Sequence, residues 1–343
     1  MKITINDIAL ACHVSKATVS RYLNRSGYVS ADVADKIKAK IKELNYIPSE
    51  TARSLSTKNS NVIGVVVPEV GNPFFAEIFK GISSIADAND LNILYCNTDN
   101  NATKELKTLA MLRKYNIAGL IITPASSCSV DESYDEKIIN VINQLETPVV
   151  LLDRDIESVS WDGVFTDNTK GAYICTKLLI TEGHKKIATI TGDKNLKLGK
   201  ERLKGFTDAL LDSGSYIDPE NIYEGDFTTE TAYKLTREMM SKMDKPTGLF
   251  SPNNLTTIGI LKALHELGYN IPEDIALVAF DDIELLTTLN INLSVVERNA
   301  ENMGRRTMEL LLERIHGDDG CIGNKRVIIT PEIISRGSEE LLS

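Results

Sequence analysis

A short segment near the start of the chain carries side chains that suit nucleic acid. It reads HVSKATVSRYLN and covers residues 13–24. Lys16 and Arg21 are donors for phosphate oxygens and guanine edges, and the hydroxyl side chains around them suit phosphate. The segment therefore predicts a face that meets a polyanion, and other elements must hold that face in place.

Charge is distributed unevenly along the 343 residues, whose formal net charge is −10. Residues 1–60 contain ten Lys and Arg against five Asp and Glu, a net charge of +5, which leaves −15 for the other residues. A small basic module on a large acidic body indicates that the first sixty residues meet a polyanion while the rest of the chain avoids it.

Residue patterns that mark other classes of protein are missing from the sequence. The five cysteines are odd in number and widely spaced, which indicates neither a disulfide framework nor a metal site. No motif of a hydrolase, zinc protease, P-loop or dinucleotide-binding protein occurs, and the four histidines lie far apart. No apolar run is long enough to span a membrane, and no signal peptide opens the chain. We therefore expect a cytoplasmic protein that is not an enzyme, with no catalytic residue, no cofactor, no metal and no membrane partner.

Helix signals place the basic segment among three short helices. Thr4 and Ser15 are N-cap residues for two helices with apolar residues at helical spacing, and Ser30 begins a third. Two short helices joined by a tight turn and braced by a third form a helix-turn-helix. A proline then ends the pattern, residues 49–56 could form a weak further helix, and a domain boundary is expected near 58–61.

From Val62 onwards, apolar strand patterns alternate with amphipathic helix patterns. Continuous apolar strands are typical of parallel sheets that helices cover on both faces. The sequence therefore predicts an α/β core of two doubly wound units. The predicted strands cover 62–67, 93–96, 118–123, 148–152, 187–190, 248–250 and 275–280, and helices are predicted near 75–89, 103–115, 136–145, 169–182, 202–213, 229–243 and 256–267.

Segments along the whole chain resemble one protein family. Similarity to the DNA-binding headpiece of LacI/GalR-type bacterial transcriptional regulators is found in TINDIALACHVSKATVSRYLN and NYIPSETARSL. The core of that family, which itself resembles periplasmic sugar-binding proteins, is matched in order by NPFFAEIFKGI, VVLLDR, DNTKGA, GHKKIATITG, RLKGF and GYNIPEDIALVAFDD. The resemblance implies a headpiece at 1–60, one core subdomain from 61–160 with 291–322, and another from 162–289 with 323–340.

The resemblance also implies a function. A homodimer would bind a roughly palindromic operator and repress a carbohydrate or sugar-acid utilisation operon. A small-molecule effector between the core subdomains would control it, as inducer or corepressor, and some relatives answer instead to a phosphorylated carrier protein. A sugar-binding transport protein would share the core, but we would expect a signal peptide in place of the basic module.

The resemblance assigns the second helix to the major groove of DNA. Lys16 and Arg21 would donate to guanine, and Ala17 would contact a thymine methyl group. A hinge helix over 49–56 would fold on the operator, with Leu55 wedged into the minor groove. The alternatives are that the two cations are only solvated and that the leucine packs on the core. The predicted DNA-binding residues are Thr4, Ser15, Lys16, Ala17, Thr18, Ser20, Arg21, Asn24, Ala52, Arg53 and Leu55.

The family's effector positions carry over to a set of residues that mostly follow core strands. The aromatic residues of NPFF would stack on a sugar face. Asn254 stands where the family usually has Asp, and Arg298 where relatives often have Gln, so the pocket gains positive charge. With Arg154 and Arg202, three guanidiniums would converge on one pocket that faces Asp153 and Asp281. This gain favours an acidic effector, a sugar acid or a sugar phosphate, over a neutral sugar. The predicted effector-binding residues are Asn72, Phe74, Phe75, Asp153, Arg154, Arg202, Asn253, Asp281 and Arg298.

Plain structural roles stay open for several of these residues. Arg298 could pair with Glu297 or Glu301 at a helix start. Phe74 could belong to the core, and Arg202 could only pair with a carboxylate.

Overall fold

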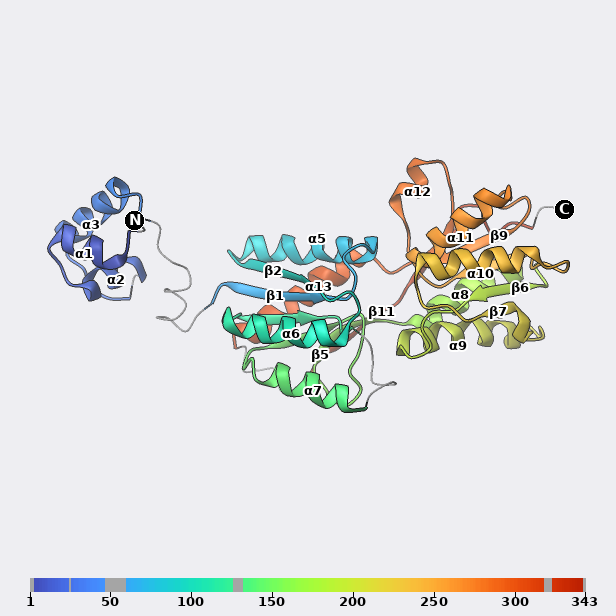
Figure 1. Ribbon diagram of the computed structural model, residues 1–343, viewed down its shortest axis with the longest axis horizontal. Coiled ribbons are helices and arrows are strands. Elements are labelled where there is room, and N and C mark those ends of the chain that lie inside the picture. The colour runs from blue at the N-terminus through green and yellow to red at the C-terminus, as the bar shows by residue number, and fades with distance from the viewer. Residues whose placement is uncertain (1–2, 25, 47–59, 126–131, 318–322, 342–343) are drawn as a thin grey trace. The chain divides into compact units, whose positions relative to one another are not determined.

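The structure is a computed structural model that describes residues 3–24, 26–46, 60–125, 132–317 and 323–341. The chain divides into a small unit, Met1–Asn61, and a large unit, Val62–Ser343. Figure 1 shows the elements of both units. None of the described helices combines the length and the apolar content that crossing a bilayer requires.

The small unit is a bundle of three helices, as the sequence predicts. They are α1 (Ile5–Cys12), α2 (Lys16–Asn24) and α3 (Ala31–Glu43). One buried side chain or more from each helix forms the core, which consists of Ile8, Ala9, Cys12, Val19 and Ile37. At the start of α1 the Thr4 amide and hydroxyl both donate to the Asp7 carboxylate. Val19 faces inward from α2, so the opposite face of α2 is left to solvent.

The first half of the large unit is a six-stranded parallel sheet with helices on both faces. Its strand order is β11-β5-β4-β3-β1-β2. The helix pair α5 (Pro73–Ala88) and α13 (Ala300–Ile315) packs on one face, and α6 (Ala102–Lys114) and α7 (Glu132–Asn143) pack on the other. The strands are β1 (Val62–Val67), β2 (Asn92–Asn97), β3 (Gly119–Ile122), β4 (Val149–Leu152), β5 (Asp162–Thr166) and β11 (Arg326–Ile329).

The second half repeats this architecture with the strand order β12-β10-β9-β8-β6-β7, in which only β12 is antiparallel. The faces are covered by α8 (Asn168–Thr181) with α9 (Lys197–Asp212), and by α10 (Thr229–Ser241) with α11 (Asn254–Leu267). The short helices η1 (Pro219–Asn221) and α12 (Glu284–Thr288) complete it. The strands are β6 (Ile187–Ile190), β7 (Ile222–Tyr223), β8 (Gly248–Ser251), β9 (Ala276–Phe280), β10 (Ser294–Glu297) and β12 (Glu332–Ile334).

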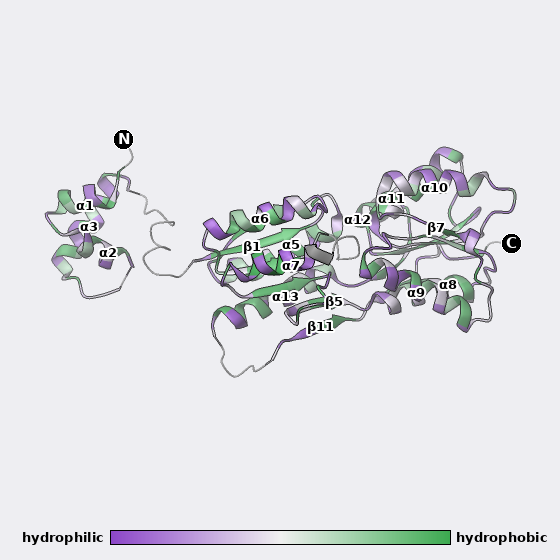
Figure 2. Cartoon of the chain, turned by 60° about the horizontal axis from the view of Figure 1, so that its bottom comes forward, coloured by the Kyte–Doolittle hydropathy of each residue, from purple (hydrophilic) through white to green (hydrophobic). Residues whose placement is uncertain are grey.

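The alternation of apolar strands with amphipathic helices explains the helix-covered sheets of both halves of the large unit. Figure 2 shows hydrophobic residues along β1, and helices such as α9 and α10 that alternate hydrophobic and hydrophilic residues around their circumference. The five-residue segment of β9 is buried throughout. Such strands bury both faces, which is the arrangement that parallel sheets with crossover helices require.

The chain crosses between the two halves of the large unit three times, at positions that differ from the expected subdomain boundaries. The sheet order assigns β5 and β11 to the first sheet and β10 to the second. The crossovers therefore lie between β5 and α8, between β10 and α13, and between β11 and β12, instead of near 161, 290 and 322. These strands have three to five residues each, and pairing with strands distant in sequence decides their sheet. A local apolar pattern does not contain that information.

Candidate functional site

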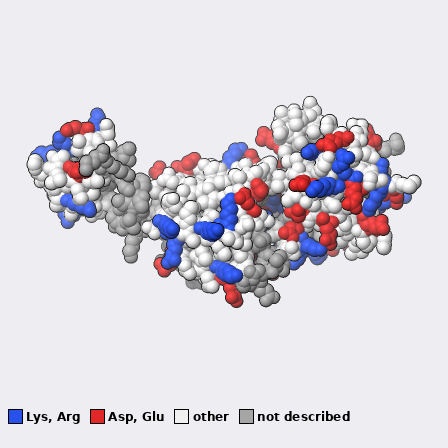
Figure 3. Space-filling view, viewed as in Figure 1, with Lys and Arg blue, Asp and Glu red and all other residues white. Residues whose placement is uncertain are grey.

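The exposed face of α2 carries the cations that the sequence assigns to DNA. Lys16, Ala17 and Arg21 are exposed. The hydroxyl of Ser15 accepts a hydrogen bond from the Thr18 amide at 3.1 Å, which caps the helix. Figure 3 shows Lys and Arg side chains on the surface of this unit. The helix therefore presents donors to solvent while its apolar side holds the bundle together.

The other residues of this predicted DNA interface differ in how far they are exposed. Thr4 and Ser15 are exposed, whereas Thr18, Ser20 and Asn24 are half-buried. The Asn24 amide donates to the Ser20 hydroxyl at 3.3 Å. The predicted hinge segment 49–56, with Ala52, Arg53 and Leu55, lies outside the described residues.

The nine predicted effector residues line one pocket in the large unit. The pocket has a volume of about 650 Å³, which includes the open solvent at its mouth, and it lies where strands of both sheets end. This is where open α/β sheets bind ligands. The residues around it are Pro68, Glu69, Asn72, Phe74, Phe75, Asn100, Asp153, Arg154, Leu198, Arg202, Asp226, Phe227, Thr228, Asn253, Leu255, Asp281 and Arg298.

Two aspartates occupy equivalent places in the two sheets. Asp153 follows β4 and Asp281 follows β9, and both adopt left-handed backbone conformations, with φ of 63° and 74°. Each donates its backbone amide to a neighbouring strand, to the carbonyl of Val164 or Val296, at 2.8 Å in both cases. The left-handed conformation is unfavourable for most L residues but tolerated by Asp. It turns both carboxylates out of the strand direction at the sheet ends.

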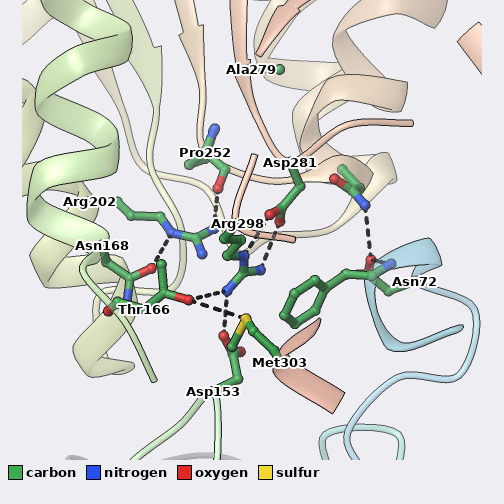
Figure 4. Close-up of polar contacts among 12 residues, drawn as sticks. Asn72, Asp153, Thr166, Asn168, Arg202, Pro252, Ala279, Asp281, Arg298 and Met303 are labelled. Carbon is green, nitrogen blue, oxygen red and sulfur yellow. Dashed lines mark hydrogen bonds and ion pairs between the residues drawn. The ribbon is translucent and has the colours of Figure 1, made fainter. Parts of the chain in front are cut away.

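Arg298 connects these two carboxylates, as Figure 4 shows. Its Nε and Nη2 donate to Asp281 at 2.6 and 2.8 Å, and its Nη1 donates to Asp153 at 2.5 Å. Its guanidinium lies 3.6 Å from the ring centroid of Phe74. Burial disfavours the charged guanidinium, but the two aspartates outweigh burial and raise the pKa of Arg298 above its ordinary value.

This geometry excludes the alternative pairing of Arg298 at the start of a helix. The residue pairs with two aspartates of the pocket, and neither Glu297 nor Glu301 is its partner. All three guanidinium nitrogens already donate within the protein. The charge of Arg298 is therefore compensated by Asp153 and Asp281, the two carboxylates that the pocket was expected to face.

Arg202 is the second buried guanidinium of the pocket. Its Nε donates to Asn168 at 3.0 Å, and its Nη1 donates to the carbonyl of Pro252. It lies over the ring of Phe280, 3.7 Å from the centroid. Burial, together with the charge of Arg298, lowers the pKa of Arg202 to about 10, so it stays charged at neutral pH. Its hydrogen bonds go to neutral partners, in contrast to those of Arg298.

Arg154 turns toward the loop after β3. Its Nη1 donates to Asn100 at 2.7 Å and to the carbonyls of Pro124 and Ala125. Burial lowers the pKa of Arg154, although nearby carboxylates, including that of Glu105, oppose this shift. Of the three guanidiniums that line the pocket, Arg154 therefore serves mainly to hold this loop.

The remaining predicted residues combine structural and pocket roles. The Asn72 side chain caps α5 by accepting from the Phe74 amide at 3.0 Å, and it also accepts from Asn254 across the subdomains at 3.3 Å. Phe74 and Phe75 belong to the core of the first subdomain, so the core role left open for Phe74 is confirmed. Asn253 caps α11 by accepting from Thr256.

Phe227 lines the same pocket and was not predicted. It has a φ of 68°, which is rare for an aromatic residue, and its ring covers the Cα of Gly192 so closely that a Cβ there would lie 1.8 Å away. The Asn253 amide donates to its carbonyl at 3.3 Å. Phe227 is half-buried and could offer ring surface to a ligand. It stands in the polar segment EGDFTTE without helical or strand periodicity, so only its aromatic character in a polar loop could have drawn attention to it.

The described residues contain no group of three or more His, Cys, Asp or Glu side chains placed to hold a metal ion. Two carboxylates of the pocket, those of Asp153 and Asp281, pair with the guanidinium of Arg298. Such an arrangement can bind polar groups between the subdomains and offers no nucleophile activated by a base.

Comparison with known proteins agrees with this geometry. Residues 4–49 match the model of the bacterial regulatory proteins of the lacI family, and residues 176–339 match the periplasmic binding protein-like domain. The HTH-type transcriptional repressor PurR of Aliivibrio salmonicida (strain LFI1238) is 31% identical over 336 residues, which cover 98% of each chain. PurR of Haemophilus influenzae (strain PittEE) is 33% identical over 98% of each chain.

Solved structures share the fold. A lac repressor dimer bound to operator and the anti-inducer ONPF superposes with a TM-score of 0.83 at 24% identity, over 99% of this chain and all of the other. The complex of the transcriptional regulator CelR with cellobiose gives a TM-score of 0.72 at 25% identity, over 98% of this chain and 99% of the other. The likeness to the lac repressor shows the fold alone, whereas the PurR relatives show the family. The chain belongs to the lacI family: it is a helix-turn-helix DNA-binding transcriptional regulator with a periplasmic-binding-protein-like, effector-binding core, and it is not an enzyme.

Proposed function

We propose that this regulator represses, in the cytoplasm, genes for the use of a carbohydrate or sugar acid. It binds a roughly palindromic operator as a homodimer, with one α2 in the major groove of each half-site. The observation that carries this proposal is the exposed row of Lys16, Ala17 and Arg21 on a helix whose opposite side is buried. These side chains can reach base edges without any loss of packing in the bundle.

The side chains of α2 divide into two groups in this proposal. Lys16 and Arg21 donate to guanine, and Ala17 contacts a thymine methyl group. The polar residues Thr4, Ser15, Thr18, Ser20 and Asn24 contact phosphates and set the register of the helix. The hinge residues Ala52, Arg53 and Leu55 complete the interface in the minor groove.

The effector binds in the pocket between the core subdomains. Cellobiose in the CelR complex and ribose in a structure of a lacI-family regulator from Enterococcus faecium, 26% identical to this chain, support a carbohydrate-type effector. The acid group of a sugar acid or sugar phosphate would then bind Arg202, whose hydrogen-bond partners among the described residues are neutral. The ring of Phe227 favours a planar heterocycle, such as a purine, as the second candidate.

An effector can change operator affinity only through its different affinities for the two arrangements of the core. The effector acts as an inducer if it favours the arrangement that binds DNA less well, and as a corepressor in the opposite case. A phosphorylated carrier protein is a further corepressor that this scheme allows.

DNA binding tests the proposal directly. The full-length protein would be used to select an operator from random duplexes, and its affinity would be measured by fluorescence anisotropy. We expect Lys16→Ala and Arg21→Ala to cost about 1–3 kcal/mol each on the selected operator and to relax its sequence preference. Lys38→Ala, an exposed lysine on α3, is the matched control and should bind as the unaltered protein does.

The dependence of DNA affinity on salt concentration is the second test of the proposal. Affinity should fall steeply between about 50 and 200 mM salt, because each phosphate contact releases a counterion. Equal affinity of the unaltered protein for the selected operator and for a scrambled duplex would contradict sequence-specific binding. Unchanged affinity in both α2 variants would contradict the assignment of the interface.

A further inference from the structure

Arg298 is placed where it touches both subdomains of the core at once. It lies on the crossover between β10 of the second sheet and α13, which packs on the first. Two of its nitrogens hold Asp281 of the second subdomain, and the third holds Asp153 of the first. Its flat face rests on Phe74, again from the first subdomain. All three nitrogens and one face of the guanidinium therefore contact residues of the core, and together these contacts connect its two subdomains.

Burial makes this connection strong. The side chain of Arg298 is 4% exposed, and each of the two aspartates is 7% exposed. Water screens such charges poorly, and a buried ion that loses its partner is left uncompensated. The subdomains cannot separate at this point without exposing or isolating at least one of the three charges.

Two other forked ion pairs of the core differ in this respect. Arg336 holds Asp282 through both of its terminal nitrogens, and both residues belong to the second subdomain. Arg314 holds Asp162 at 2.6 and 3.0 Å, and both belong to the first. These two pairs have the same forked chemistry as Arg298 with Asp281 but do not bridge the crossovers.

We propose that Arg298 is an inter-subdomain latch. It positions Asp153 and Asp281 against each other and fixes the effector-free arrangement of the core, instead of offering a free guanidinium to the effector. The effector then meets a pair of carboxylates whose charge is already compensated. Only the DNA readout of this proposal rests on the proposed function, because the latch itself is a property of the core.

Hydrogen–deuterium exchange of the full chain without ligand tests the latch. Arg298→Gln removes it, and Asp153→Asn weakens only its link to the first subdomain while the shape of the side chain is kept. We expect peptides that span the three crossovers to exchange roughly threefold faster or more in both variants. The matched controls Arg314→Gln and Arg336→Gln each lose a forked pair inside one subdomain and should leave crossover exchange unchanged.

A double-mutant cycle separates a latch from general loosening. If Arg298 and Asp153 act as one unit, the double variant should exchange no faster at the crossovers than the more affected single variant. Effects that add, or equal exchange in all four single variants, would overturn the proposal. Asp153→Asn keeps the test valid if Arg298→Gln fails to fold.

Operator affinity gives an independent readout. Both latch variants should shift effector-free affinity for the selected operator in the same direction, by about fivefold or more, and the two controls should not. Shifts of opposite sign would overturn the latch. If the unaltered protein selects no operator, the proposed function fails, and the exchange experiment still decides the latch.

Discussion

Two guanidiniums and two carboxylates are buried where the subdomains meet, so their charges balance before any ligand arrives. Arg298 is held by both aspartates, while Arg202 bonds neutral groups and stacks on Phe280. An acidic effector would therefore have to be recognised through Arg202. The identity of the residue at position 298 alone does not predict the charge of the effector.

Glu105 is a buried carboxyl group on α6 that accepts a hydrogen bond from the Ala125 amide, in the loop that Arg154 contacts, and we expect it to make stability depend on pH. It is fully buried, and burial raises its pKa to about 7 although Tyr134 and the Ala125 amide donate hydrogen bonds to it. The folded chain then binds this proton more tightly than the unfolded chain, whose glutamate titrates near its ordinary value of 4.5. The free energy of unfolding should therefore fall as pH rises from about 4.5 to 7 and level off above that range.

The variant Glu105→Gln should not show this fall. Relative to the unaltered protein, it should gain on the order of 3 kcal/mol between about pH 5 and 8, as measured by denaturant unfolding. Glu136→Gln, an exposed residue on α7, is the control and should follow the unaltered pH profile. Parallel profiles for all three proteins would show that the proton on Glu105 is not linked to folding.

The pair α5 and α13 positions both Asn72 and the crossover that carries Arg298. The two helices meet at glycines: a Cβ at Gly81 would lie 2.0 Å from the carbonyl oxygen of Glu301. We expect Gly81→Ala to force the helices apart and to lower the free energy of unfolding by about 1–3 kcal/mol. In the control Gly71→Ala, the added methyl group meets only the flexible carboxylate of Glu69. Equal unfolding midpoints for the two variants would contradict the close approach.

Local sequence patterns predict the helices and strands of this protein better than they predict which strands pair with one another. The caps and apolar spacing around Thr4 and Ser15 locate the first two helices, and strands β1 to β4, β6, β8 and β9 were predicted close to their observed bounds. Strands β5, β7, β10, β11 and β12 were missed because they are short and, apart from β5, not fully buried. The sheet to which each belongs is decided by long-range pairing.

The site shows the same division between local and long-range information. All nine predicted effector residues line the pocket, because residues after parallel strands gather at one sheet edge. The resemblance places Arg298 in a pocket that faces Asp153 and Asp281, but the hydrogen bonds between them could not be predicted, since Asp153 lies 145 positions away along the chain. Phe227 was missed because a strained loop, and no periodic pattern, presents it.

At the scale of the whole molecule, the chain joins a basic module to an acidic core. The headpiece packs around its own five buried residues, and the core has its own apolar layers on both sides of each sheet. Each unit can therefore meet its own ligand. In the proposed function, the link between them is the effect of core ligands on operator affinity.

The most direct measurement is therefore operator affinity with and without a core ligand. Thermal unfolding against neutral sugars, sugar acids, sugar phosphates and purines would first identify a ligand that stabilises the protein, by about 2.7 kcal/mol at 100 times its Kd. Anisotropy of the selected operator with the full-length protein would then be recorded at constant salt. We predict that this ligand changes operator affinity by about 5- to 150-fold and leaves binding to a scrambled duplex unchanged. The same operator affinity with and without the bound ligand would contradict the account.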